Sequence, residues 1–330
     1  MRVAILGNGG FGTAMALALQ RVGHTIALWG HDPVYTAQIA ASRQNPRYLE
    51  SFVLPDAIRV THDAAAVLDR ADVALLAVPT QHVRGVLVAM APTIPPTLPI
   101  VSLAKGLEER TGARPSEVAA AVLGHPERVF VLGGPSHAEE IARDLPTTVV
   151  LAGTDDESLQ RLQARLTTPT FRIYRNTDML GIELCGALKN VMALAAGIAD
   201  GLGYGDNAKA AILSRGIVEM MRFGQGLGAD PRTFAGLAGV GDLAVTAFSS
   251  HGRNRAFGER IGRGETLQQA LAASAKVAEG VWTSRVVVEQ AQRRHVDMPI
   301  ATAVARVLFE GLSPRAAVRE LMERDPKSEA

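Results

Sequence analysis

The sequence lacks several features that would place it in other classes of protein. Cys185 is the only cysteine among 330 residues, so no disulfide can form within the chain and a secreted, disulfide-stapled scaffold is excluded. Aromatic residues make up only 5% of the chain, whereas small aliphatic residues and glycine are abundant, which suits α/β or all-helical structure. The formal net charge is +1 with no basic tail, which argues against nucleic acid or an anionic membrane as the principal partner.

From the sequence we also expect neither a targeting segment nor a helix that spans a membrane. A strand-and-glycine pattern begins within the first few residues, so we expect no signal peptide. The apolar run Met179–Ile198 is long enough to span a bilayer, but it contains Glu183, Lys189 and Asn190. A buried helix explains this run better, and we predict a cytoplasmic protein without stable membrane insertion.

The length and the order of patterns predict two domains. Short β-branched runs alternate with helical segments in the first half, which is typical of a parallel sheet with crossover helices. A helix is predicted at Phe11–Arg21, and strands are predicted at Arg2–Leu6, Thr25–Trp29, Asp72–Val78, Ile100–Leu103, Val129–Leu132, Thr147–Leu151 and Phe171–Tyr174. The strand pattern ends near residue 178, so we predict an α/β domain over 1–178 and an all-α domain over 179–330.

The segment from Gly7 to Gly12 matches G-x-G-x-x-G directly between the first predicted strand and helix. Glycines permit a tight turn and let the backbone approach a pyrophosphate, while the helix N-terminus offers N–H groups to phosphates. We therefore predict a Rossmann dinucleotide-binding domain with a doubly wound, mostly parallel sheet.

The end of the second predicted strand leaves the choice of dinucleotide open. Asp32 could bind the ribose hydroxyls of NAD, whereas His31 could face the 2′-phosphate of NADP. Asp32 followed by Pro33 equally fits a helix N-cap with proline at the first helical position. We expect NADP or NAD, with NADPH slightly favoured.

Lys189 and Asn190 stand side by side in an apolar run, LGIELCGALKNVMALAAGIA. Burying an ammonium costs free energy, and a buried lysine suits proton transfer near neutral pH. The alternative is that Lys189 reaches the surface from an ordinary core helix.

Three further polar segments are candidates for ligand contacts. Lys105 and Ser136 follow predicted strands, where the crevice of a doubly wound sheet binds ligands, although an exposed loop lysine and a serine cap are the alternatives. The loop Ser250–Arg255 has the composition of a phosphate clamp, or of a solvated surface cluster. His137 and the two glutamates after it lack further ligands at suitable spacing, so no metal is predicted.

Together these segments resemble the bacterial NAD(P)-dependent glycerol-3-phosphate dehydrogenases over nearly the whole chain. The resemblance is carried by GNGGFGTAMA at 7–16, LWGHDP at 28–33, LAKGLE at 103–108, GGPSHAEE at 133–140, ELCGALKNVMALAAGIADGLGYGDNAKAAILSRG at 183–216, GLAGVGDL at 236–243, GRNRAFG at 252–258 and AEGVWT at 278–283. It implies a helical C-terminal domain like that of 6-phosphogluconate dehydrogenase. It also implies reversible hydride transfer between NAD(P)H and dihydroxyacetone phosphate, a phosphotriose, giving sn-glycerol 3-phosphate for glycerophospholipids, and a homodimer.

The same resemblance implies roles for individual residues, with Lys189 as proton donor and acceptor. Substrate contacts are implied for Lys105, Gly134, Ser136, Lys189, Asn190, Asp242, Gly252, Arg253 and Asn254. Cofactor contacts are implied for Gly7, Gly9, Gly10, Phe11, Gly12, His31, Lys105, Ala138, Arg253, Val277 and Glu279.

The chain departs from the family pattern at a few positions. Gly10 and Phe11 stand where the family often has serine or alanine followed by tryptophan or tyrosine. Gly252 replaces a frequent serine, and Glu50 replaces a common proline. The choice between NADP and NAD and the affinity for phosphate therefore stay open, as do regulation and the dominant direction. A hydroxyacid or ketopantoate-type dehydrogenase and a non-catalytic dinucleotide sensor are the rival interpretations.

Overall fold

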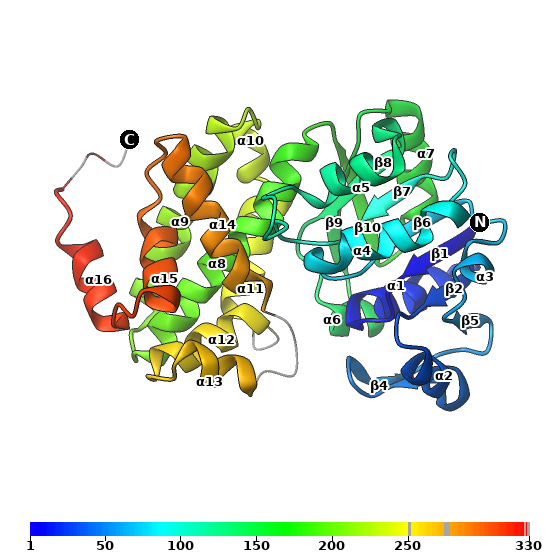
Figure 1. Ribbon diagram of the computed structural model, residues 1–330, viewed down its shortest axis with the longest axis horizontal. Coiled ribbons are helices and arrows are strands. Elements are labelled where there is room, and N and C mark those ends of the chain that lie inside the picture. The colour runs from blue at the N-terminus through cyan, green and yellow to red at the C-terminus, as the bar shows by residue number, and fades with distance from the viewer. Residues whose placement is uncertain (250–251, 274–277, 327, 329–330) are drawn as a thin grey trace. The chain divides into compact units, whose positions relative to one another are not determined.

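The computed structural model describes residues 1–249, 252–273, 278–326 and 328 (Figure 1). The chain divides into two compact units. The first unit comprises Met1–Glu108 and Ala113–Glu183, and the second comprises Glu109–Gly112 and Leu184–Ala330.

The first unit contains an eight-stranded sheet with the order β10-β9-β8-β7-β6-β1-β2-β5. Its strands are β1 (Arg2–Leu6), β2 (Thr25–Trp29), β5 (Ile58–Thr61), β6 (Val73–Leu76), β7 (Ile100–Ser102), β8 (Val129–Gly133), β9 (Thr147–Ala152) and β10 (Phe171–Asn176). The strands from β5 to β8 in this order are parallel, whereas β9 pairs antiparallel with β8 and parallel with β10. The succession of parallel strands reverses at β1, because β2 and β5 lie on one side of it and β6, β7 and β8 lie on the other. The predicted doubly wound, mostly parallel sheet is therefore confirmed.

Both faces of the sheet are covered by helices. Along β1, Val3 and Ile5 belong to one hydrophobic cluster, and Ala4 and Leu6 belong to another, because successive side chains of a strand point to opposite faces. The first cluster includes residues of α1 (Gly10–Arg21), α2 (Pro33–Ser42), α6 (Ala138–Ala142) and α7 (Asp156–Leu166). The second includes residues of α3 (Ala64–Leu68), α4 (Thr80–Met90) and α5 (Pro115–Leu123).

The predicted strands are all present, with ends that differ by up to two residues. The prediction missed β5 and the small antiparallel hairpin of β3 (Gln44–Asn45) and β4 (Leu49–Val53). These short segments include exposed polar residues such as Arg59 and Glu50, so they lack the continuous apolar run of a central strand. The antiparallel direction of β9 depends on the path of the chain, which hydrophobic pattern alone does not reveal.

The second unit is helical. Its elements are most of α8 (Met179–Gly201), α9 (Asp206–Gly226), α10 (Pro231–Phe234), the π-turn η3 (Leu237–Gly241), α11 (Asp242–Phe248), α12 (Arg253–Gly262), α13 (Leu267–Ala272), α14 (Glu279–Arg293), α15 (Pro299–Phe309) and α16 (Pro314–Met322). The predicted change from α/β to all-helical structure therefore occurs at α8.

Helix α8 is the core helix of the second unit. Among the described residues it is the one helix that is long and apolar enough to cross a membrane, and 94% of its most apolar window is buried inside the protein. Burial within the fold accounts for its apolar sequence, since a fully buried helix is hydrophobic all round.

Candidate active site

The glycine-rich loop after β1 has the shape that close approach of a phosphate requires. Gly7 has φ 129°, and a Cβ there would lie 2.5 Å from the carbonyl oxygen of Ala77. A Cβ on Gly12 would lie 2.0 Å from the carbonyl oxygen of Gly7, whereas a Cβ on Gly9 would meet nothing within 4 Å. Helix α1 begins at Gly10, and no side chain caps its N-terminus. The loop therefore fits the pyrophosphate of a dinucleotide, with space above Gly9 and N–H groups directed outward.

The glycine-rich loop is supported by a network of hydrogen bonds from side chains of α2 and of the β3–β4 hairpin. Asn45 is fully buried and donates to the Asn8 carbonyl oxygen at 2.8 Å and to Thr13 Oγ1 at 2.7 Å. The hydroxyl of Tyr35 donates to Asn45 Oδ1 at 2.6 Å. Because every polar atom of this network has a fixed partner, the backbone of the loop is held in one conformation.

Residues predicted to contact the cofactor gather beside this loop. An added Cβ on Gly10 would lie 3.8 Å from Cβ of Ala138 at the start of α6. Phe11 and Ala138 are both partly buried and pack on the same hydrophobic cluster.

Asp32, which follows β2, caps helix α2. Its Oδ1 accepts hydrogen bonds from the backbone N–H groups of Val34 at 3.0 Å and Tyr35 at 3.1 Å, as the N-cap of α2. The helix-cap alternative is therefore correct, and the other oxygen lies 3.8 Å from Nη1 of Arg47. His31 is exposed, with its ring centroid 6.2 Å from that of Trp29.

The predicted substrate residues of the first unit meet at the carboxyl ends of β7 and β8. Lys105 Nζ donates to the Gly134 carbonyl oxygen at 2.8 Å and to Ser136 Oγ at 3.2 Å. Ser136 Oγ donates to the same carbonyl oxygen at 3.0 Å. The N-cap of α6 is His137, so the serine is not the cap of that helix.

Lys189 lies in the interior of the second unit, so the alternative of a surface-reaching lysine is wrong. It is 7% exposed, and its Nζ donates to Asp242 Oδ1 at 2.5 Å and to Thr246 Oγ1 at 2.8 Å. Thr246 Oγ1 in turn donates to the Asp242 carbonyl oxygen at 2.6 Å. The carboxylate compensates the charge of the buried ammonium, and the two contacts fix the position of Nζ.

The neighbouring residue Asn190 belongs to a second buried network. Asn254 Nδ2 donates to Asn190 Oδ1 at 2.9 Å, and the Gly280 N–H donates to Asn254 Oδ1 at 3.0 Å. Because Gly280 N–H can only donate, it fixes which end of the Asn254 amide points toward Asn190, and thereby orients both amides.

A close crossing of α8 and α12 brings these asparagines together. An added Cβ on Gly197 would lie 2.0 Å from the carbonyl oxygen of Arg255, and one on Gly258 would lie 2.2 Å from that of Leu194. The absence of side chains at these positions lets the two backbones touch. Since Arg253 and Asn254 are the first residues of α12, the crossing places the start of this helix beside Asn190.

The remaining predicted residues lie at the ends of helices. Arg253 is exposed at the start of α12 after the buried N-cap Gly252, and Glu279 is half-buried at the start of α14. Val277 lies outside the described residues. No group of three or more potential metal ligands occurs in the described part of the chain.

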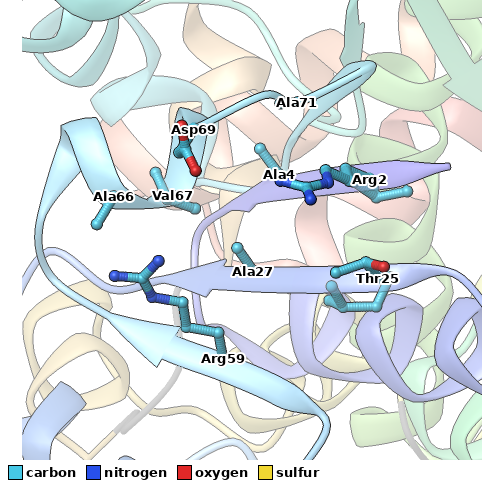
Figure 2. A pocket seen from close by; sticks show the side chains of 11 residues that line it. Arg2, Ala4, Thr25, Ala27, Arg59, Ala66, Val67, Asp69 and Ala71 are labelled. Atoms are coloured by element: carbon cyan, nitrogen blue, oxygen red, sulfur yellow. The ribbon is translucent and has the colours of Figure 1, made fainter.

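One pocket of the first unit lies away from all these residues. It has a volume of about 90 Å³ and is lined by residues at the amino ends of β1 and β2, including Arg2 and Thr25 (Figure 2). Ligands of doubly wound folds bind at the opposite, carboxyl ends of the strands. This pocket is therefore not part of the candidate active site.

Comparison with known proteins identifies the family. The model of the NAD-dependent glycerol-3-phosphate dehydrogenase N-terminus matches residues 2–159, and that of the C-terminus matches residues 178–319. The chain belongs to this family of glycerol-3-phosphate dehydrogenases. The predicted resemblance is thereby confirmed.

Individual members of the family are similar over their whole length. A glycerol-3-phosphate dehydrogenase (NAD(P)+) from Chlorobium limicola is 45% identical over 100% of this chain and 99% of its own. One from Streptomyces griseus is 46% identical over 100% of this chain and 98% of its own. The crystal structure of the glycerol-3-phosphate dehydrogenase from Coxiella burnetii is 38% identical with a TM-score of 0.93, covering 98% of this chain and 99% of that one.

Two contributors to the site were missed from the sequence. Thr246 lies four residues after Asp242 on α11, so helical spacing already places both on one face of the helix. The backbone N–H of Gly280 carries no side-chain signal, and only the structure reveals its hydrogen bond to Asn254.

Proposed function

We propose that this protein catalyses the reversible reduction of dihydroxyacetone phosphate to sn-glycerol 3-phosphate, with Lys189 as proton donor and acceptor. The proposal rests mainly on the buried cluster in which Asp242 and Thr246 hold the Lys189 ammonium. Membership of the glycerol-3-phosphate dehydrogenase family and relatives named for use of NAD(P)+ support the reaction and the type of cofactor.

In this mechanism, bound NADPH or NADH supplies the hydride. Lys189 donates a proton to the ketone oxygen as negative charge develops there, and accepts it in the reverse direction. A developing alkoxide next to a positioned ammonium is stabilised more strongly than the neutral ketone, which is the condition for faster chemistry. Asp242 and Thr246 contribute by fixing Nζ, so the donor does not need to reorganise during the reaction.

The other polar groups bind and orient the substrate in this proposal. Asn190 and Lys105 orient the reacting oxygen, while Arg253 and Asn254 hold the phosphate. Gly134, Ser136 and Gly252 contribute further substrate contacts from their turns. The glycine loop from Gly7 to Gly12, together with His31, Ala138, Val277 and Glu279, holds the dinucleotide.

The physiological setting follows from the same assignment. We expect a cytoplasmic homodimer that reduces the ketone and supplies sn-glycerol 3-phosphate for glycerophospholipid synthesis. Sedimentation of the purified protein tests the homodimer, since a monomeric mass would contradict it.

The first test replaces the proposed proton donor. Lys189→Met should lower kcat for dihydroxyacetone phosphate by at least ~10²-fold, measured as consumption of NADPH at 340 nm. Binding of NADPH, followed by calorimetry, should persist because Lys189 is not assigned to the cofactor. Addition of methylamine to a Lys189→Ala variant should restore part of the lost turnover. Near-normal turnover of Lys189→Met would contradict the assignment.

The second test separates this function from its rivals. Ketopantoate and simple 2-ketoacids replace dihydroxyacetone phosphate in the same assay, with NADPH and NADH tried separately. Preference for a ketoacid would favour the hydroxyacid dehydrogenase interpretation. Dinucleotide binding without turnover of any of these substrates would favour a sensor.

A further inference from the structure

Arg47, in the turn between β3 and β4, lies beside the carboxyl end of β2, because its guanidinium is 3.8 Å from the carboxylate of Asp32. In Rossmann folds this strand end faces the adenosine ribose, where an acidic residue favours NAD and a nearby arginine accommodates the 2′-phosphate of NADP. Both residue types are present here, as Asp32 and Arg47, so their contacts decide between the two cofactors.

The carboxylate of Asp32 already has partners in the protein. Oδ1 accepts the hydrogen bonds of Val34 and Tyr35 at the start of α2, and Oδ2 lies 3.8 Å from the guanidinium of Arg47. A ribose hydroxyl would have to compete with a helix cap and an ion pair. Asp32 is therefore less available to a ribose hydroxyl than a carboxylate without these partners would be.

Arg47 is held by contacts that leave its guanidinium accessible. Its Cζ lies 4.0 Å from the centroid of the Tyr35 ring, and its backbone N–H donates to the Tyr35 hydroxyl at 3.0 Å. Tyr35 itself is 3% exposed, whereas the Arg47 side chain is 59% exposed. A planar guanidinium stacked on a fixed ring loses little entropy when its donors engage a phosphate in two parallel hydrogen bonds.

The hairpin that carries Arg47 is also connected to the glycine loop. The Tyr35 hydroxyl contacts Asn45, which in turn donates to the carbonyl oxygen of Asn8 and to Thr13. The position of Arg47 is therefore fixed, through buried hydrogen bonds, relative to the loop that fits the pyrophosphate.

We propose that Arg47, with His31 at the end of β2, binds the 2′-phosphate of NADPH and makes this enzyme prefer NADPH to NADH. The inference rests on the proposed function only in that the cofactor is NAD(P). In the structure, the exposed guanidinium of Arg47 has the carboxylate of Asp32 as its ion-pair partner at 3.8 Å. In the complex with NADPH, the 2′-phosphate is a second, more strongly charged partner of the same guanidinium.

Calorimetric titration with 2′,5′-ADP and with 5′-AMP tests the site without catalysis. Arg47→Gln should weaken 2′,5′-ADP by at least ~10-fold, the scale of losing a hydrogen-bonded charge pair, and change 5′-AMP by less than ~3-fold. In turnover of dihydroxyacetone phosphate, the ratio of kcat/KM for NADPH to that for NADH should fall by a similar factor. Asp32→Asn keeps an oxygen for the helix cap but removes a negative charge, so it should strengthen 2′,5′-ADP.

Arg59→Gln is the matched control. Arg59 is an exposed arginine of the same unit on β5, beside the pocket at the amino ends of the strands, and its replacement removes the same charge (Figure 2). It should leave the ratio of 2′,5′-ADP to 5′-AMP affinity unchanged.

Equal weakening of both ligands by Arg47→Gln would overturn the inference, because it would show a merely structural role, and so would unchanged affinity for 2′,5′-ADP. A protein that does not turn over dihydroxyacetone phosphate but loses 2′,5′-ADP selectively in Arg47→Gln would contradict the proposed function and support the inference.

Discussion

Glu219 on α9 is another buried ionisable side chain of the helical unit, and its surroundings differ from those of Lys189 and Asp242. It is 3% exposed, and its carboxylate accepts hydrogen bonds from the backbone N–H groups of Ile300 at 2.7 Å and Ala301 at 3.3 Å. It thus caps the N-terminus of α15 from another helix. Burial raises the pKa of Glu219 to about 7, although the two N–H groups act in the opposite direction.

This pKa predicts how stability depends on pH. Between the ordinary value of 4.5 and about 7, the folded state binds more protons at Glu219 than the unfolded state does. The contribution of Glu219 to the free energy of unfolding is therefore fully present below pH 4.5 and falls as the pH rises to 7, by about 3 kcal/mol. Glu219→Gln keeps an acceptor for α15 but does not ionise, so it should gain stability relative to the wild type over this range.

Urea unfolding of both proteins at pH 5 and pH 8 measures that difference. Glu289→Gln, which changes an exposed glutamate of α14, is the control and should follow the wild type at both pH values. A Glu219→Gln variant whose stability changes in parallel with the wild type would show that Glu219 does not titrate in this range.

At the scale of elements, α8 and α12 pack against each other through a row of glycines, and this row lies next to the candidate substrate residues Asn190 and Asn254. The nearest backbone neighbours are Leu194 for Gly258 and Ile198 for Gly262, and Asn254 bonds to Asn190 one turn earlier. The same sequence offset of 64 separates all three pairs (258 and 194, 262 and 198, 254 and 190), so the helices run parallel with one register. Contact of the backbones thereby determines where the Asn190–Asn254 pair lies.

Gly258→Ala should disturb stability and substrate binding together. Its Cβ would lie 2.2 Å from the Leu194 carbonyl oxygen, so α12 must move away from α8. Overpacking of this kind costs about 1–3 kcal/mol, and we expect KM for dihydroxyacetone phosphate to rise several-fold more than KM for NADPH. Denaturant unfolding and steady-state kinetics provide the two measurements.

Gly85→Ala on α4 is the comparison for that prediction. A Cβ at Gly85 meets nothing within 4 Å, so alanine should stabilise this helix by about 0.5–1 kcal/mol and leave both KM values unchanged. If Gly258→Ala behaves like Gly85→Ala, close contact between α8 and α12 does not position the asparagines.

The same elements show how far sequence reasoning reaches. The strand that carries the glycine loop and the apolar helix that carries Lys189 follow from local patterns, because their residues repeat with the period of each structure. The contact of Lys189 with Asp242 across 53 residues depends on tertiary packing, whereas the hydrogen bonds of Asp32 with the start of its own helix are local. For Asp32, local pattern left both a ribose contact and a helix cap open, and the folded chain shows the cap.

At the scale of the whole molecule, the chain passes repeatedly between its two units. The short segment Glu109–Gly112 groups with the second unit, whereas the chain on either side of it groups with the first. Helix α8 begins in the first unit and continues without interruption into the second. Within the first unit, the Glu183 carboxylate in the first turns of α8 accepts hydrogen bonds from Arg114 at 2.7 Å and from the Ser116 N–H at 2.8 Å, which fixes the start of this helix. Because α8 is one continuous helix shared by both units, we expect the units to unfold cooperatively.

The two tryptophans of the chain allow a direct test, because each unit contains one. Trp29 is buried at the end of β2, and Trp282 lies on α14 with its ring 6.3 Å from that of Phe309. A Trp282→Phe variant reports the first unit by fluorescence, and a Trp29→Phe variant reports the second. At 100 times its Kd, 2′,5′-ADP should add about 2.7 kcal/mol to the unfolding free energy. Since α8 belongs to both units, thermal unfolding midpoints should rise equally with both reporters. A rise seen only by Trp29 would show that the dinucleotide-binding unit unfolds independently of the unit that carries Lys189.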